Sequence, residues 1–137
     1  MKKIFYLICL SILINSCAWF DENEHQKIIG QYEVGWNDLE SNRAITKKIK
    51  NSENYYDIIV DSYVFAVGHN ENYIIAKQHQ NFNVETNYYL IDINKNEKDN
   101  SKGINGPLNE MEFEKMKAEL NIKNINFDMN FNDKPFN

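Results

Sequence analysis

The chain has 137 residues, with 15 basic and 20 acidic side chains and a formal net charge of −5. An acidic balance argues against nucleic acid as a partner, because nucleic-acid-binding domains need Lys and Arg to neutralise phosphates. Aromatic residues make up 13% of the chain, which argues against a disordered protein.

The first sixteen residues have the layout of a secretory signal peptide. Lys2 and Lys3 form a positive region, and the apolar run Ile4–Ile14 that follows is eleven residues long. A membrane-spanning helix needs about 20 apolar residues, so this run is too short for a stop-transfer anchor. We expect the signal peptide to be removed by cleavage between Ser16 and Cys17.

Cys17 indicates a particular kind of signal. The small Ser16 directly before it and the branched Ile14 at the third position back resemble the lipobox of bacterial lipoproteins. The resemblance implies a diacylglyceryl group, with palmitate as a typical chain, on the Cys17 sulfur. Two or more acyl chains hold a protein stably at a membrane, at about 0.8 kcal/mol per buried methylene. The alternative is an ordinary signal peptide with a coincidental cysteine.

Removal of residues 1–16 leaves 121 residues with 13 basic and 20 acidic side chains, a net charge of −7. This length is typical of one domain with a substantial core. Cys9 is lost with the signal, so the mature chain cannot form an internal disulfide. We expect a signal peptide at 1–16, a lipidated cysteine and tether at 17–27, and a single β-rich domain at 28–137.

The predicted location is the bacterial cell envelope, with the protein held by its lipid. Ala18 directly after the cysteine resembles the pattern that other Gram-negative lipoproteins carry to the outer membrane, which is the favoured site. The acidic residues Asp21, Glu22 and Glu24 either resemble a surface-export signal of some Bacteroidetes lipoproteins or form a solvated linker.

Six segments of the domain are rich in β-branched and aromatic residues and are bounded by Asn, Asp, Gly and Ser, which predicts strands. They are Ile28–Trp36, Ala44–Ile49, Tyr55–Val60, Tyr63–Gly68, Tyr73–His79 and Tyr88–Ile93. The fourth and fifth predict a hairpin in which Gly68 lies opposite Tyr73. Both faces of this hairpin are apolar, so we expect it to lie centrally, with other elements packed on each side.

One helix is predicted, over Glu110–Leu120. Asn109 and Glu112 have the spacing of a capping box, and Leu108 and Phe113 have that of a hydrophobic staple. The buried stripe is expected to contain Phe113, Met116 and Leu120.

The remaining segments complete the predicted fold. Residues 94–105 are polar and predict a loop, and the apolar alternation over residues 122–127 predicts a last strand. One helix cannot cover six or seven flat strands. We therefore expect an α+β domain in which a curved antiparallel sheet of about six or seven strands packs with the C-terminal helix. A partly closed barrel with the helix across one mouth is the alternative.

No metal or cofactor site is predicted. Asp92 begins a segment that starts like a calcium loop, but Glu97 stands where glycine is needed and Gly103 where glutamate is needed. His69 and His79 fall at opposite ends of the predicted hairpin, about ten residues apart at ~3.3 Å each, and so cannot share one zinc ion. His25 lies in the expected tether.

No catalytic residue is predicted either. None of the serines lies in a G-x-S-x-G or S-x-x-K motif, and the only mature thiol is the lipidation site. Asp57 and Asp61 form a candidate glycosidase-like pair, although carboxylates near a turn are usually solvated. Glu110, Glu112 and Glu114 lie at the start of the predicted helix, where negative charge is favourable.

Several segments together resemble a family of small uncharacterised bacterial proteins, often lipid-anchored, that is classed as a domain of unknown function. They are Val60–Asn70, Tyr73–Gln78, Tyr88–Asp92 and Gly106–Phe113. The resemblance covers residues 28–128. It implies a membrane anchor but no activity and no catalytic residue.

These observations favour a lipid-anchored envelope protein that binds an envelope protein or glycan and is not an enzyme. A first alternative is an inhibitor of a foreign hydrolase or toxin, because an acidic surface suits a basic target. A second is an enzyme that uses the carboxylates of Asp57 and Asp61.

Overall fold

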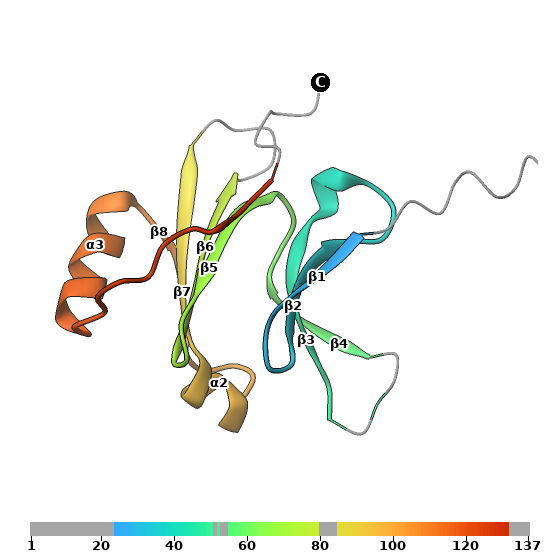
Figure 1. Ribbon diagram of the computed structural model, residues 1–137, viewed down its shortest axis with the longest axis horizontal. Coiled ribbons are helices and arrows are strands. Elements are labelled where there is room, and N and C mark those ends of the chain that lie inside the picture. Colours follow the sequence, from blue (N-terminus) through green and yellow to red (C-terminus); the bar gives the residue numbers. More distant parts are fainter. Residues whose placement is uncertain (1–23, 51, 53–54, 80–84, 132–137) are drawn as a thin grey trace, which may run out of the picture.

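A computed structural model describes residues 24–50, 52, 55–79 and 85–131. Two antiparallel sheets of four and five strands lie face to face, and one helix covers the outer face of the larger sheet, as Figure 1 shows from right to left. The domain is thus α+β-like, as expected. The predicted single curved sheet or partly closed barrel is wrong, because the strands divide between two sheets.

The four-stranded sheet is a meander in the order β1-β2-β3-β4. Its strands are β1 (Glu24–Ile29), β2 (Tyr32–Trp36), β3 (Ala44–Lys48) and β4 (Tyr56–Val60), with a short 3-10 helix, η2 (Glu40–Asn42), before β3. The predicted strand Ile28–Trp36 is wrong, since the chain turns at Gly30, whose φ is +57°. Residues 24–27, expected in the tether, are paired with β2.

The five-stranded sheet has the order β8-β7-β6-β5-β9. Its strands are β5 (Val64–His69), β6 (Tyr73–His79), β7 (Thr86–Asp92), β8 (Ile104–Leu108) and β9 (Met129–Asn130). The hairpin of β5 and β6 is confirmed, but Gly68 lies opposite Ile75 and not Tyr73. Over Ala66–His69 this displacement of two residues keeps the side chains on their expected faces, because side chains alternate with a period of two. A β-bulge between Val64 and Ala66 interrupts the alternation, so Val64 lies in the same core as Val67 and not on the opposite face as predicted.

The segment predicted as a polar loop contains a helix and a strand. Helix α2 (Ile93–Lys98) begins where the Asp92 side chain accepts a hydrogen bond from the Lys95 backbone N–H at 3.1 Å. Strand β8 follows and forms an edge of the sheet. The last strand is also misplaced in the prediction, since residues 122–127 are irregular and β9 comes after them.

Two apolar cores lie on the two sides of the five-stranded sheet. The core between the sheets contains Ile28, Tyr32, Val34, Ile45, Ile59, Val60, Val64, Val67, Ile74, Ala76, Ile91 and Ile93. The core under the helix contains Ile75, Tyr88, Leu90, Phe113 and Ile125. Because adjacent residues of β6 contribute to different cores, the predicted central position of the hairpin is confirmed.

Helix α3 (Glu110–Glu119) is the predicted helix. The Asn109 side chain accepts from the Glu112 N–H, and the Glu112 carboxylate accepts from the Asn109 N–H, both at 2.9 Å, which confirms the capping box. Phe113 is buried, but Leu120 is exposed, so the predicted stripe is narrower than expected. Among the described residues, no helix is long and apolar enough to cross a membrane.

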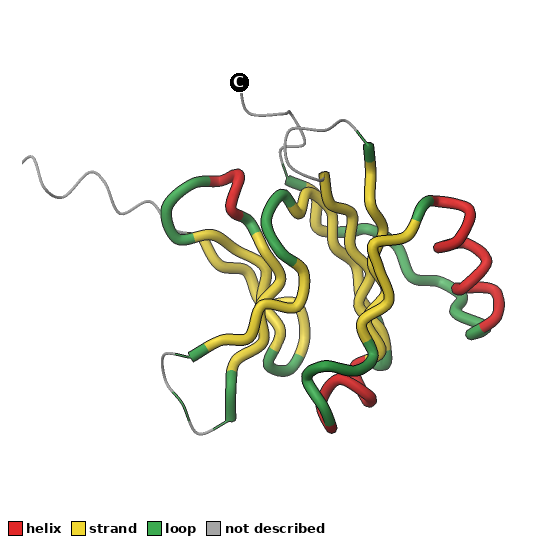
Figure 2. Tube along the Cα trace, turned by 180° about the vertical axis from the view of Figure 1, so that it is seen from behind, coloured by secondary structure: helices red, strands yellow, loops and turns green. Residues whose placement is uncertain are grey.

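Polar residues connect the two sheets at both ends. At one end of the molecule, helix α2 lies below the two sheets, as Figure 2 shows from behind. At the other end the buried Arg43 pairs with Glu40 at 2.8 Å, and its guanidinium lies 4.4 Å from the centre of the Phe131 ring. The backbone N–H of Phe131 donates to Phe65 O at 2.8 Å, so Arg43 helps to hold the C-terminal segment on β5.

Candidate functional site

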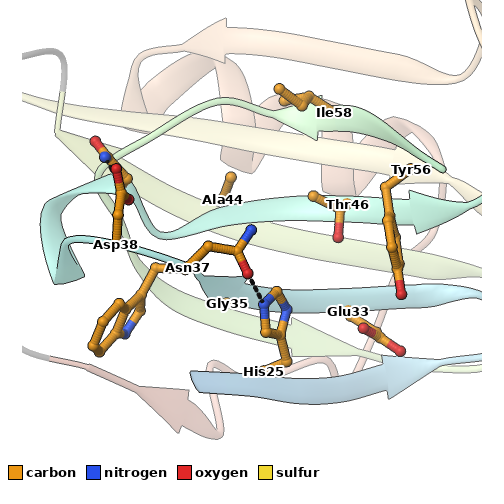
Figure 3. A pocket seen from close by; sticks show the side chains of 11 residues that line it. His25, Glu33, Gly35, Asn37, Asp38, Ala44, Thr46, Tyr56 and Ile58 are labelled. Carbon is orange, nitrogen blue, oxygen red and sulfur yellow. Dashed lines mark hydrogen bonds between the residues drawn. The ribbon is translucent and has the colours of Figure 1, made fainter. Parts of the chain in front are cut away.

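A hollow of about 570 Å³ on the outer face of the four-stranded sheet is the first candidate site (Figure 3). Alternation along β2 points Tyr32 and Val34 into the core and Glu33 and Gly35 outward. The middle of the hollow is lined by small residues, which are Gly35, Ala44 and Thr46. The volume falls within the range of small-ligand sites.

Gly35 is required by the close packing of β1 on β2. A Cβ atom at this position would lie 2.2 Å from Glu24 O and 2.7 Å from His25 Nδ1, far inside normal contact distances. His25 lies directly opposite Gly35 in the strand pairing. Because Gly35 has no side chain, the His25 ring fits against it and the hollow stays open.

The His25 ring is held by Asn37. Its Nε2 lies 2.8 Å from Asn37 Oδ1, and the two side chains form one wall of the hollow (Figure 3). An amide oxygen accepts hydrogen bonds, so the His25 Nε2–H is the donor in this pair. The sequence placed His25 in the tether, and nothing in the sequence indicated that β1 begins before it.

The rim of the hollow is acidic. Glu33 and Asp38 both line it, and among its described lining residues there is no Lys or Arg. The Asp38 carboxylate accepts from the Asn42 amide at 2.8 Å and from the Leu39 N–H at 2.7 Å. These hydrogen bonds lower the pKa of Asp38, first through Asn42 and then through Leu39, so its charge is secure at neutral pH.

The opposite wall is apolar and open to solvent. Tyr56 and Ile58 project from β4 on the outer face, with 43% and 64% of their surfaces exposed (Figure 3). Trp36 also lines the hollow, and its indole Nε1 is buried with no hydrogen-bond partner among the described residues. Exposed apolar side chains around a concave surface are typical of interaction sites.

A second pocket, of about 320 Å³, lies where β4 leads into β5. Its lining is mostly polar: Asp61, Ser62, Tyr63, Gln78, His79, Asn87, Tyr89 and Pro107. The sequence singled out Asp61 only as half of a carboxylate pair and gave no sign that these polar groups meet, because they come from three separate segments.

The structure separates the two members of that carboxylate pair. Asp57 lies on the inner side of β4, where its carboxylate accepts from the Asn100 side chain, whereas Asp61 lies beyond the end of the strand. Four strand residues at ~3.3 Å each span about 13 Å. Glycosidase carboxylates lie roughly 5–9.5 Å apart, so this arrangement gives the candidate dyad no support.

The other residues considered from the sequence have structural positions or lie outside the described part of the chain. Asp92 caps α2 and therefore has a structural role. His79 stacks on Phe65 with ring centres 4.2 Å apart. No group of three or more His, Cys, Asp or Glu residues in the described ranges could hold a metal. Ser16 and Cys17 fall outside those ranges.

A buried polar network around Asn96 was not predicted. Asn96 Oδ1 accepts from the Tyr32 hydroxyl at 2.8 Å, and its backbone oxygen accepts from Lys47 Nζ at 2.7 Å. The Asn96 amide donates to Asn100 O and Lys102 O, both at 2.9 Å. Burial lowers the pKa of Lys47. Every polar group named here has a partner within the protein, so the network is structural.

The sequence profile of a family described as protein of unknown function (DUF3997) matches residues 29–132. The chain belongs to this family. The DUF3997 match extends from the last residue of β1 past β9, so it includes strands β2–β9, α3 and every lining residue of the two sites except His25. The predicted resemblance to a family of unknown function is thereby confirmed, while the lipid anchor stays a prediction. No curated protein and no solved structure matches the chain.

Proposed function

We propose that the chain is a lipid-anchored protein of the bacterial cell envelope that acts by binding and not by catalysis. The lipobox-like sequence at Cys17 supports the anchor, and the hollow on the outer face of the four-stranded sheet is the proposed binding surface. The observation that carries the proposal is the exposure of Tyr56 and Ile58 beside that hollow.

The proposed ligand is a basic protein segment that carries an apolar side chain. The apolar side chain enters the hollow between His25 and Tyr56, where it removes Tyr56 and Ile58 from water. Lys or Arg residues on either side of it lie near Glu33 and Asp38 on the rim. Complementary charge of this kind speeds association and excludes acidic partners.

Photo-crosslinking in intact cells tests the binding surface. A benzophenone amino acid at position 58 should capture a partner protein, whereas the same group at position 111 should not. Met111 is a suitable control because it is 77% exposed on α3, away from the hollow. Equal capture at the two positions, or no capture at either, would remove the support for this surface.

The acidic rim also favours the second candidate function, inhibition of a basic foreign hydrolase. An assay of muramidase activity at micromolar protein tests this version directly. Inhibition that disappears in the double variant Glu33→Gln and Asp38→Asn would support it. No inhibition by the unaltered protein would leave an envelope protein as the proposed partner.

The anchor is tested separately. Cells grown with labelled palmitate should incorporate label into the protein, and Cys17→Ser should abolish both the label and membrane fractionation. Protease treatment of intact cells then tells the outer surface from the periplasm. Membrane association without label would contradict the lipid anchor but would leave the binding surface unaffected.

A further inference from the structure

We propose that the polar pocket between the β4–β5 connection and the ends of β6 and β7 is a binding site for a neutral saccharide. The pocket has a volume of about 320 Å³, close to the lower limit of small-ligand sites. It shares no lining residue with the hollow on the four-stranded sheet. The two proposals therefore rest on different observations.

The base of the pocket is built around Gln78, which is buried. Its amide nitrogen donates to Asp61 O and Ser62 O, both at 3.0 Å. Its amide oxygen accepts from the Tyr89 hydroxyl at 3.2 Å and from the Asn87 amide at 3.4 Å. One side chain thus fixes the connection and orients two polar groups of β7, so little ordering remains to be done when a ligand binds.

The connection itself is held in a strained conformation. Tyr63 has a φ of +70°, which is rare for a bulky residue. Its N–H donates to Ser41 O at 2.9 Å, and its oxygen accepts from the His79 N–H at 3.1 Å. Strain of this kind costs about 1–3 kcal/mol and is concentrated at binding sites, where the surrounding structure maintains it.

The chemistry of the lining matches hydroxyl groups. A sugar hydroxyl both donates and accepts, and the pocket offers a carboxylate at Asp61, a hydroxyl at Ser62 and an amide at Asn87. Burial, and then the charge of Asp61, raises the pKa of Tyr89, so its phenol keeps the proton that it donates to Gln78, and its oxygen can accept from a sugar hydroxyl. Tyr89 also brings an aromatic ring to the lining, the kind of group that packs against the C–H face of a sugar ring.

The charge of the pocket selects against anions. Among its described lining residues there is no Lys or Arg, the side chains that normally recognise phosphate and sulfate. Asp61 would repel an anionic group. A neutral saccharide is therefore favoured over a phosphorylated or sulfated one.

Calorimetric titration of the full-length protein tests the proposal. The protein is kept in lauryl dimethylamine oxide, because a detergent with a sugar headgroup would compete. The probes are diacetylchitobiose, maltose and mannobiose, with glucose 6-phosphate as the anionic comparison. We expect at least one neutral disaccharide to bind with a millimolar or lower Kd, and glucose 6-phosphate to bind more weakly or not at all.

Two variants locate the binding. Asp61→Asn and Asn87→Ala should each weaken the bound disaccharide about tenfold, the effect of losing one or two hydrogen bonds to a ligand. Asp99→Asn is the matched control, since Asp99 lies between α2 and β8 and does not line the pocket, so this substitution should leave the affinity unchanged. Circular dichroism and the urea midpoint confirm that each variant is folded.

Three outcomes would overturn the proposal. They are no binding of any neutral probe at tens of millimolar, tighter binding of glucose 6-phosphate than of all the neutral probes, and neutral binding that neither pocket variant weakens. The crosslinking experiment at position 58 is independent of these measurements, so failure of one proposal is distinguishable from failure of the other.

Discussion

Replacement of Tyr32 by phenylalanine removes one hydroxyl from the junction of the two sheets. Tyr32 and Asn96 are both 0% exposed, and the hydroxyl donates to Asn96 Oδ1 at 2.8 Å. In Tyr32→Phe that oxygen keeps only the longer contact from Lys47 Nζ, at 3.4 Å. A buried acceptor that loses its main donor costs about 1–3 kcal/mol, so we expect the free energy of unfolding at neutral pH to fall by that amount.

The same substitution should change the pH dependence of stability. Burial, followed by the charges of Glu97 and Asp92, raises the pKa of Tyr32 from 10.0 to about 12. A raised pKa means that this group's stabilisation is complete below pH 10 and is lost as the pH rises toward 12. The loss reaches about 1.4 kcal/mol by roughly pH 11. Tyr32→Phe has no phenol to ionise and does not undergo this loss. The difference in the free energy of unfolding between the unaltered protein and the variant should therefore shrink by about this amount.

Urea denaturation followed by circular dichroism, at neutral pH and at several values up to about pH 11, measures both effects. Lys47 titrates in the unaltered protein and in the variant, so its contribution largely cancels in the difference. Tyr55→Phe, on a ring that is 71% exposed, is the control and should follow the unaltered protein throughout. Parallel loss of stability in Tyr32→Phe and the unaltered protein above pH 9 would refute the argument.

Three further substitutions and one control have defined consequences for the urea midpoint. Gly35→Ala should destabilise by about 1–3 kcal/mol, because its Cβ would collide with the backbone of β1; unchanged stability would mean that the two strands can separate. Phe113→Ala should cost about 3–5 kcal/mol, since this ring is 1% exposed, whereas Met111→Ala should change stability by less than about 0.5 kcal/mol. Asn109→Ala should cost about 1 kcal/mol through loss of the capping box, and a variant as stable as the parent would contradict that role.

Local signals in the sequence predicted the elements that depend on near neighbours. The capping box joins Asn109 to a residue three positions away, and the two-sided apolar pattern of β5 and β6 is visible in the strands themselves. The register was displaced by two residues because pairings two residues apart place the same side chains on the same faces, so the hydrophobic pattern does not distinguish between them.

Long-range contacts explain what the sequence did not show. The segment after β7 is polar in sequence, yet Asn96 within it is buried. Its burial could not be predicted locally, because its partners Tyr32 and Lys47 are 64 and 49 positions away. The turn at Gly30 was missed because a single glycine between two apolar runs fits a continuous strand equally well. The polar pocket was missed for the same reason as Asn96, since only the fold brings its segments together.

The start of β1 sets the distance between the proposed binding surface and the membrane. His25 lines the hollow only eight positions after Cys17. A chain spans at most about 3.6 Å per residue, so the Cα atoms of Cys17 and His25 lie within about 29 Å of each other. That length is about the thickness of the hydrocarbon core of a bilayer. With a lipid on Cys17, the domain therefore meets only partners that enter a thin layer of solvent at the membrane surface. A partner anchored in the same membrane meets it at a much higher effective concentration than a freely diffusing one.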